Sequence, residues 1–149
     1  MNIQELLSYK DYKDGLKALY DAFDLTLGYK FDDKDNASQD KDQQQFIADD
    51  NYIKDMYGWS LTETWDLDRT LCEFLLPRLY VFYKTDITLE SEYDEGIFSY
   101  ILETILEGLL LILSDYSIYN FNEEQVLYKE AKTKEAFTLL GKYMQRLWN

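Results

Sequence analysis

The chain has 149 residues, and its 29 Asp and Glu residues outnumber its 15 Lys and Arg residues, which gives a formal net charge of −14 at pH 7. This charge disfavours nucleic acid and anionic lipid as direct partners and favours a partner with a basic surface. The chain contains no histidine and one cysteine. Ser-His or Cys-His catalysis, zinc sites built from Cys and His, and a disulfide within the chain are therefore excluded.

The first part of the chain is expected to form two helices separated by a polar segment. Apolar residues recur at helical steps over residues 2–24, where Gly15 is the weakest position. Residues 25–31 are expected to form a turn or a short extended piece, and residues 32–45 a loop or the frayed start of the next helix. That helix is expected to end at Gly58, because glycine is favoured just beyond a helix C-terminus.

A central helix is expected over residues 61–84, because Ser60 and Glu63 have the spacing of a capping box. Pro77 has no amide hydrogen and crowds the preceding turn, so we expect the helix to kink or restart there. Cys72 is interpreted as a small core residue. An apolar stripe at helical steps is expected to face the core. It consists of Leu67, Leu71, Phe74, Leu75, Leu79 and Phe82.

The sequence predicts two further helices, over residues 89–114 and from Asn122 towards the C-terminus. Residues 109–113 are apolar on all sides, which places them either at the centre of a bundle or against another chain. The predicted fold is all-α, a single domain over residues 1–149 with four or five helices and a central helix kinked at Pro77. No signal peptide or membrane span is visible, so a soluble, cytoplasmic protein is expected.

Motifs for catalysis or cofactor binding are not visible in the sequence. Residues 33–38 begin like a calcium loop, but Gln44 stands where its bidentate Glu belongs. We therefore expect no enzymatic activity, no metal and no cofactor, with a carboxylate-metal hydrolase as a weaker alternative. A group of residues around the central helix is interpreted as an ion-pair set with Trp65 in the core. It comprises Trp65, Asp66, Asp68, Arg69 and Arg78.

An acidic window occupies residues 85–128, which contain ten acids and no Lys or Arg. Helical spacing places Glu92, Glu103 and Glu107 opposite the apolar stripe of their helix, where carboxylates one turn apart resemble a row of backbone phosphates. The alternative is a solvated face whose first acids suit the helix dipole. The predicted partner-binding residues are Asp86, Glu90, Glu92, Tyr93, Asp94, Glu95, Tyr100, Glu103 and Glu107.

Two motifs resemble a family of small α-helical proteins encoded by tailed bacteriophages and prophages. The first is Glu63-Thr-Trp65-Asp-Leu67-Asp-Arg-Thr-Leu followed by Pro77-Arg-Leu79, and the second is the C-terminal stretch over residues 137–148. Members of that family have Glu-Glu-Trp where this chain has Glu-Tyr-Asp-Glu at residues 92–95. The resemblance implies a phage origin and a helical fold, and nothing catalytic.

These expectations combine into a functional hypothesis. The chain would be a non-enzymatic inhibitor of a host nucleic-acid-handling defence protein, such as a CRISPR effector or another nuclease. It would present the acids of residues 86–107 to a basic groove in place of nucleic acid. The alternative is a phage structural or assembly protein that self-associates through residues 109–113.

Overall fold

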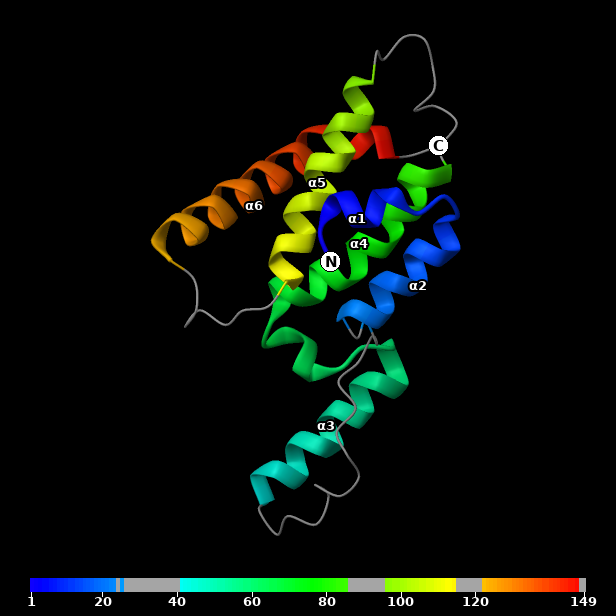
Figure 1. Ribbon diagram of the computed structural model, residues 1–149. Helices are drawn as coiled ribbons and strands as arrows, with labels where there is room; N and C mark the ends of the chain where they lie inside the picture. Colours follow the sequence, from blue (N-terminus) through cyan, green and yellow to red (C-terminus); the bar gives the residue numbers. More distant parts are fainter. Residues whose placement is uncertain (24, 26–40, 86–95, 115–121, 148–149) are drawn as a thin grey trace. The chain divides into compact units, whose positions relative to one another are not determined.

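The computed structural model describes residues 1–23, 25, 41–85, 96–114 and 122–147. The regular structure of these residues consists of helices without a strand, which confirms the all-α class (Figure 1). The α-helices are α1 (Ile3–Ser8), α2 (Tyr12–Phe23), α3 (Lys41–Tyr57), α4 (Leu67–Thr85), α5 (Ile97–Leu113) and α6 (Glu123–Tyr143). Two short 3₁₀ helices are η2 (Leu61–Thr64) and η5 (Met144–Leu147). No helix in this described part is long and apolar enough to cross a membrane.

The chain divides into two compact units. The first unit consists of Met1–Leu25 and Cys72–Asn149, and the second of Thr26–Leu71. Because α4 runs from Leu67 to Thr85, its first turn belongs to the second unit and the rest to the first. A single domain over the whole chain stays a prediction.

The N-terminal helix predicted over residues 2–24 is two helices, which brings the described α-helices to six instead of four or five. The Asn2 side chain accepts a hydrogen bond from the amide of Glu5 at 2.9 Å and caps α1. The carboxylate of Asp11 accepts one from the amide of Lys13 at 2.9 Å, just before α2 begins. Asp is a strong N-terminal cap because it satisfies an amide that has no partner within the helix. Gly15, the predicted weak point, lies inside α2.

The local start and stop signals are confirmed where the structure describes them. Gly58 follows the end of α3 with a φ of 79°. Ser60 and Glu63 form the predicted capping box, but they begin η2, and α4 starts only at Leu67. Asn122 caps α6 in the same manner. α4 is one helix with Pro77 in its interior, so it does not restart there, and the predicted kink stays a prediction.

The helix predicted to start at residue 89 starts at Ile97. Gly96 precedes it with a φ of 78° and a ψ of 2°, a left-handed conformation that does not continue an α-helix. A single helix over residues 89–114 was therefore a wrong prediction. Residues 86–95 lie outside the described residues.

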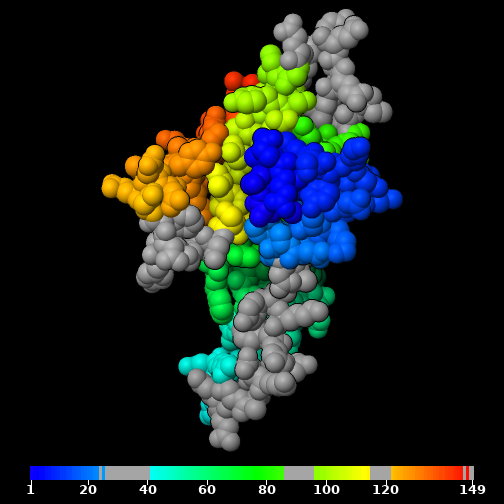
Figure 2. All heavy atoms as spheres, in the orientation of Figure 1, coloured from blue at the N-terminus to red at the C-terminus, as the bar shows by residue number. Residues whose placement is uncertain are grey.

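The core of the first unit is organised around α5. Its residues Leu102, Ile105, Leu106 and Leu109 are at most 1% exposed. Buried side chains from the other helices join them: Leu6 of α1, Leu19 of α2, Leu76 and Tyr80 of α4 and Leu140 of α6. In the space-filling view α1 and α6 lie on either side of α5 (Figure 2). Within residues 109–113 four side chains are buried and Leu111 is half-buried, so the central position is confirmed.

The predicted core stripe of α4 is partly wrong. Leu67, Leu71 and Phe74 are 64%, 42% and 46% exposed, and Trp65 is 66% exposed. The buried side of α4 is formed by Cys72, Leu76, Leu79 and Tyr80. α4 is apolar on two neighbouring sides, so its periodicity does not decide which of them faces the core. Cys72 is buried, as expected of a small core residue.

A buried carboxylate links α3 to η2 in the second unit. Asp50 of α3 is 2% exposed and accepts hydrogen bonds from Ser60 Oγ and the amide of Leu61, both at 2.7 Å. Lys54 Nζ lies 2.6 Å from the other oxygen of Asp50. Burial alone would raise the pKa of Asp50, but Lys54, Ser60 and the Leu61 amide outweigh it and hold that pKa below the usual value. The link therefore fixes α3 to η2.

Candidate protein-binding surface

The predicted partner-binding residues fall into two groups. Asp86, Glu90, Glu92, Tyr93, Asp94 and Glu95 lie outside the described residues. Tyr100, Glu103 and Glu107 lie on α5 at helical steps and form what we call the acidic strip. Tyr100 is 64% exposed, and the two glutamates are half-buried. The strip thus occupies the part of α5 that the core does not use, as the spacing predicts.

Glu103 binds the neighbouring helix α4. The hydroxyl of Tyr83 donates a hydrogen bond to Glu103 Oε1 at 2.6 Å. Burial raises the pKa of Tyr83 to about 12, together with the hydrogen bond to Glu103 and its negative charge. A carboxylate has about four acceptor sites, so Glu103 retains the capacity to accept further donors.

Glu107 binds α6 through both of its oxygens. Lys132 Nζ lies 3.1 Å from Oε2, and the hydroxyl of Tyr128 donates to Oε1 at 3.1 Å. The hydrogen bond to Glu107 raises the pKa of Lys132, and burial followed by Glu107 raises that of Tyr128. Lys132 is also 3.8 Å from Glu135. The acidic window itself contains no Lys or Arg, but α6 places Lys132 beside Glu107 as a compensating base.

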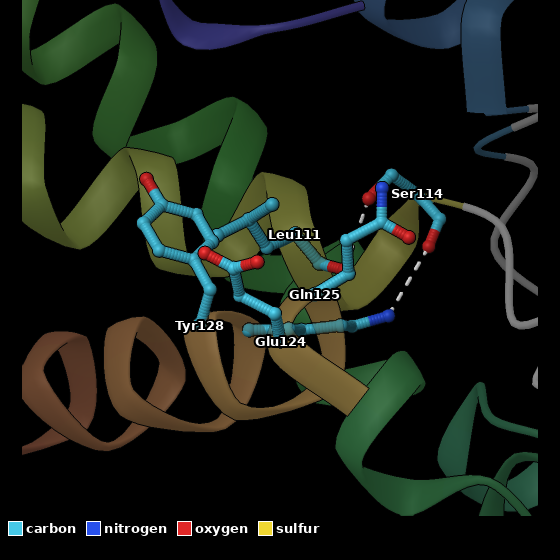
Figure 3. Close-up of a pocket in the computed structure, with 6 residues that line it drawn as sticks. Leu111, Ser114, Glu124, Gln125 and Tyr128 are labelled. Carbon is cyan, nitrogen blue, oxygen red and sulfur yellow. Dashed lines mark hydrogen bonds between the residues drawn. The ribbon is translucent and has the colours of Figure 1, made fainter. Parts of the chain in front are cut away.

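A groove continues beyond Glu107 at the end of α5 (Figure 3). It consists of two adjoining hollows of about 360 and 240 Å³ that share Leu111, Ser114 and Tyr128. Lys129 Nζ donates to the carbonyl oxygen of Ser114 at 3.3 Å. The larger hollow is also lined by Glu124, Gln125 and Lys129, and the smaller one by Met1, Asn2, Ile3, Glu107 and Leu110. The groove therefore has an apolar floor, and the charged side chains that line it are Glu107, Glu124 and Lys129.

Exposed apolar side chains accompany these carboxylates. Leu127 and Tyr128 at the start of α6 are 58% and 51% exposed, and Ile97 at the start of α5 is 57% exposed. Glu123 and Glu124 in the first turn of α6 are exposed as well. Surfaces that combine tyrosine with polar groups around an apolar centre are typical of protein interfaces.

Sequence reasoning missed Tyr83, Tyr128 and Lys132. Tyr128 and Lys132 are four residues apart on α6, a spacing that places them on one face and could have indicated a shared acidic partner. Tyr83 gives no such signal, because its partner is 20 residues away on another helix. Among the described residues no three His, Cys, Asp or Glu side chains are grouped as metal ligands would be.

Comparisons with protein-family models, with curated proteins and with solved structures found no match to this chain. The resemblance to a phage-encoded family stays a prediction.

Proposed function

We propose that this chain is a non-enzymatic binding protein that presents an acidic surface to the basic groove of a nucleic-acid-handling protein. The observation that carries the proposal is the acidic strip on α5, where Glu103 and Glu107 lie one turn apart on the side of the helix that the core does not use. The net charge of −14 favours such a partner over nucleic acid or anionic lipid.

The fixed positions of the two glutamates support this proposal over a merely solvated face. Tyr83 holds Glu103, and Tyr128 and Lys132 hold Glu107. Side chains that are already ordered lose less conformational entropy when a partner binds. Because Glu103 and Glu107 are one turn apart on α5, their Cβ atoms are separated by roughly 5–6 Å, so both carboxylates belong to one stretch of surface.

The finer form of the proposal concerns the partner. A phage protein of this kind would inhibit a host defence nuclease, for example a CRISPR effector, by occupying the groove that normally receives DNA or RNA. Inhibition would then be competitive with nucleic acid. Self-association through residues 109–113 is not proposed, because four of these five side chains are buried in the first unit.

The experiment is capture of host proteins on the immobilised chain, followed by elution with duplex DNA. The wild-type chain is expected to retain a basic protein that duplex DNA releases. Glu103→Gln with Glu107→Gln is expected to retain less of it. The matched control is Asp14→Asn with Glu130→Gln, which changes the net charge equally at exposed positions outside the acidic strip.

A second variant, Glu92→Gln with Glu95→Gln, tests the remainder of the predicted surface. Each variant is first compared with the wild type by thermal melting, so that loss of binding is separated from loss of fold. Equal retention by all variants, or a retained protein that DNA does not release, would contradict the proposal.

A further inference from the structure

The outer side of α3 carries two large apolar side chains between carboxylates. Tyr52 and Met56 are 57% and 60% exposed, and Asp49 and Asp55 beside them are exposed as well. We call these four residues the Tyr52 face. The ring of Tyr57, which is 61% exposed, meets that of Tyr52 edge-on with centroids 6.4 Å apart.

The described part of the second unit, residues 41–71, does not bury the Tyr52 face. Among the described residues 41–71 the buried side chains are those of Asp50 and Ser60, and neither is apolar. Asp50 lies on the side of α3 opposite Tyr52, because two residues along a helix correspond to about 200° of rotation. Tyr52 and Met56, one turn apart, lie together on the outer side. The side chains of Tyr52 and Met56 therefore take no part in the link between α3 and η2.

The charges around the Tyr52 face decide what it fits. Asp49 accepts a hydrogen bond from Gln45 at 2.8 Å, a neutral donor that leaves its charge in place. The base nearest in sequence, Lys54, is directed to Asp50 on the other side of the helix. A second copy of a chain with a net charge of −14 would bring like charges together at this face. A basic partner would bring opposite ones.

We propose that the Tyr52 face binds an arginine-bearing segment of a basic protein. A guanidinium group stacks on the face of a tyrosine ring and pairs with a carboxylate through two parallel hydrogen bonds. The flexible thioether of Met56 adapts to the apolar part of such a segment. The inference rests on the proposed function, since the partner is the same basic protein, and it adds a contact in the second unit.

The test is an NMR titration of the labelled full chain with an octa-arginine peptide and, separately, an octa-lysine peptide at low salt. The backbone amides of residues 49–57 are expected to shift, and octa-arginine is expected to bind there about two- to five-fold more tightly than octa-lysine. Tyr52→Ala with Met56→Ala removes that preference, whereas Tyr20→Ala, at another exposed tyrosine, keeps it.

The outcomes separate this inference from the proposed function. Shifts confined to the acidic strip would overturn the inference and leave the proposed function standing. Equal binding of the two peptides, unchanged by Tyr52→Ala with Met56→Ala, would show unspecific attraction and overturn it too. Shifts of residues 49–57 that follow protein concentration without peptide would identify a second copy as the occupant. If neither peptide binds at any residue, the proposed function fails as well.

Discussion

The hydroxyl of Tyr83 on α4 donates a hydrogen bond to Glu103 on α5 at 2.6 Å, which makes one carboxylate part of both the core packing and the acidic strip. Glu107 likewise belongs to the acidic strip and also binds Tyr128 and Lys132 on α6. The glutamates that we assign to partner binding are therefore also ties between helices, and their variants need a stability control.

Tyr83→Phe is expected to destabilise the first unit by about 1 kcal/mol, because Glu103 loses its donor while it stays half-buried. Urea unfolding at pH 7 measures the effect. If Tyr83→Phe unfolds at the wild-type urea concentration, the hydrogen bond contributes nothing to stability.

The same pair predicts a loss of stability at alkaline pH. The pKa of Tyr83 is raised from 10.0 to about 12 in the folded chain, so the folded state holds the hydroxyl proton more tightly than the unfolded state. This contribution is fully present below pH 10 and is lost as the pH rises towards 12. The difference in unfolding free energy between wild type and Tyr83→Phe should shrink over that interval. A constant difference from pH 9 to pH 12 would contradict the assignment.

For the second unit, Asp50 is expected to cause a loss of stability at acid pH, the opposite of the alkaline effect of Tyr83. Its folded pKa lies below the usual value, so its contribution is present above about pH 4 and is lost as the pH falls further. Asp50→Ala is expected to cost about 2 kcal/mol, or roughly 30-fold faster amide exchange in α3. Asp49→Ala, its exposed neighbour, is the control. Equal exchange in the two variants would show that the Asp50 link does not hold α3.

Substitutions at Gly15 and Tyr80 are expected to have coupled effects on stability, because the two residues are in contact. A Cβ at Gly15 would lie 1.9 Å from the Tyr80 hydroxyl, which is a buried polar group that lacks a hydrogen-bond partner within the described residues. Gly15→Ala is expected to destabilise by about 1–3 kcal/mol through overpacking. Tyr80→Phe removes the unpartnered hydroxyl and should be neutral or stabilising. The double variant should recover part of the loss, and additive effects would contradict the contact.

Two glycines on neighbouring helices should respond in opposite directions. A Cβ at Gly108 of α5 would lie 2.3 Å from the Cβ of Ala136 and 3.0 Å from the backbone oxygen of Lys132, whereas one at Gly141 meets nothing within 4 Å. Gly108→Ala should therefore push α5 and α6 apart and lower the melting temperature. Gly141→Ala should raise stability by up to about 1 kcal/mol through helix propensity. A harmless Gly108→Ala would contradict the close packing of the two helices.

Local signals in the sequence predicted the helix boundaries best. The capping boxes at Ser60 and Asn122 and the glycine at residue 58 act within one turn of chain, so their structural effect follows from the residues alone. The second helix start at Asp11 was visible in the same way and was missed. The apolar residues 109–113 left a central position or contact with another chain open, and their burial decides for the first; the helix at the centre of the core is α5 and not the helix over residues 61–84.

Features that depend on contacts between distant segments could not be predicted from local signals in the sequence. The side of α4 that faces the core depends on which helices cover it, and both candidate sides are apolar. The pairing of Glu107 with Lys132 depends on the close approach of α5 and α6 at Gly108. For the same reason the acidic window indicated a surface without bases, although α6 brings a lysine beside it.

The most direct test of the central claim is a competition titration between this chain and duplex DNA for the basic protein that the immobilised chain retains. The anisotropy of fluorescently labelled DNA reports its binding to that protein. We predict that added wild-type chain displaces the DNA, that the apparent Kd for DNA rises in proportion to the chain's concentration, and that Glu103→Gln with Glu107→Gln weakens the effect. Unchanged DNA binding while the chain is also bound would contradict the claim that its acidic surface occupies the nucleic-acid groove.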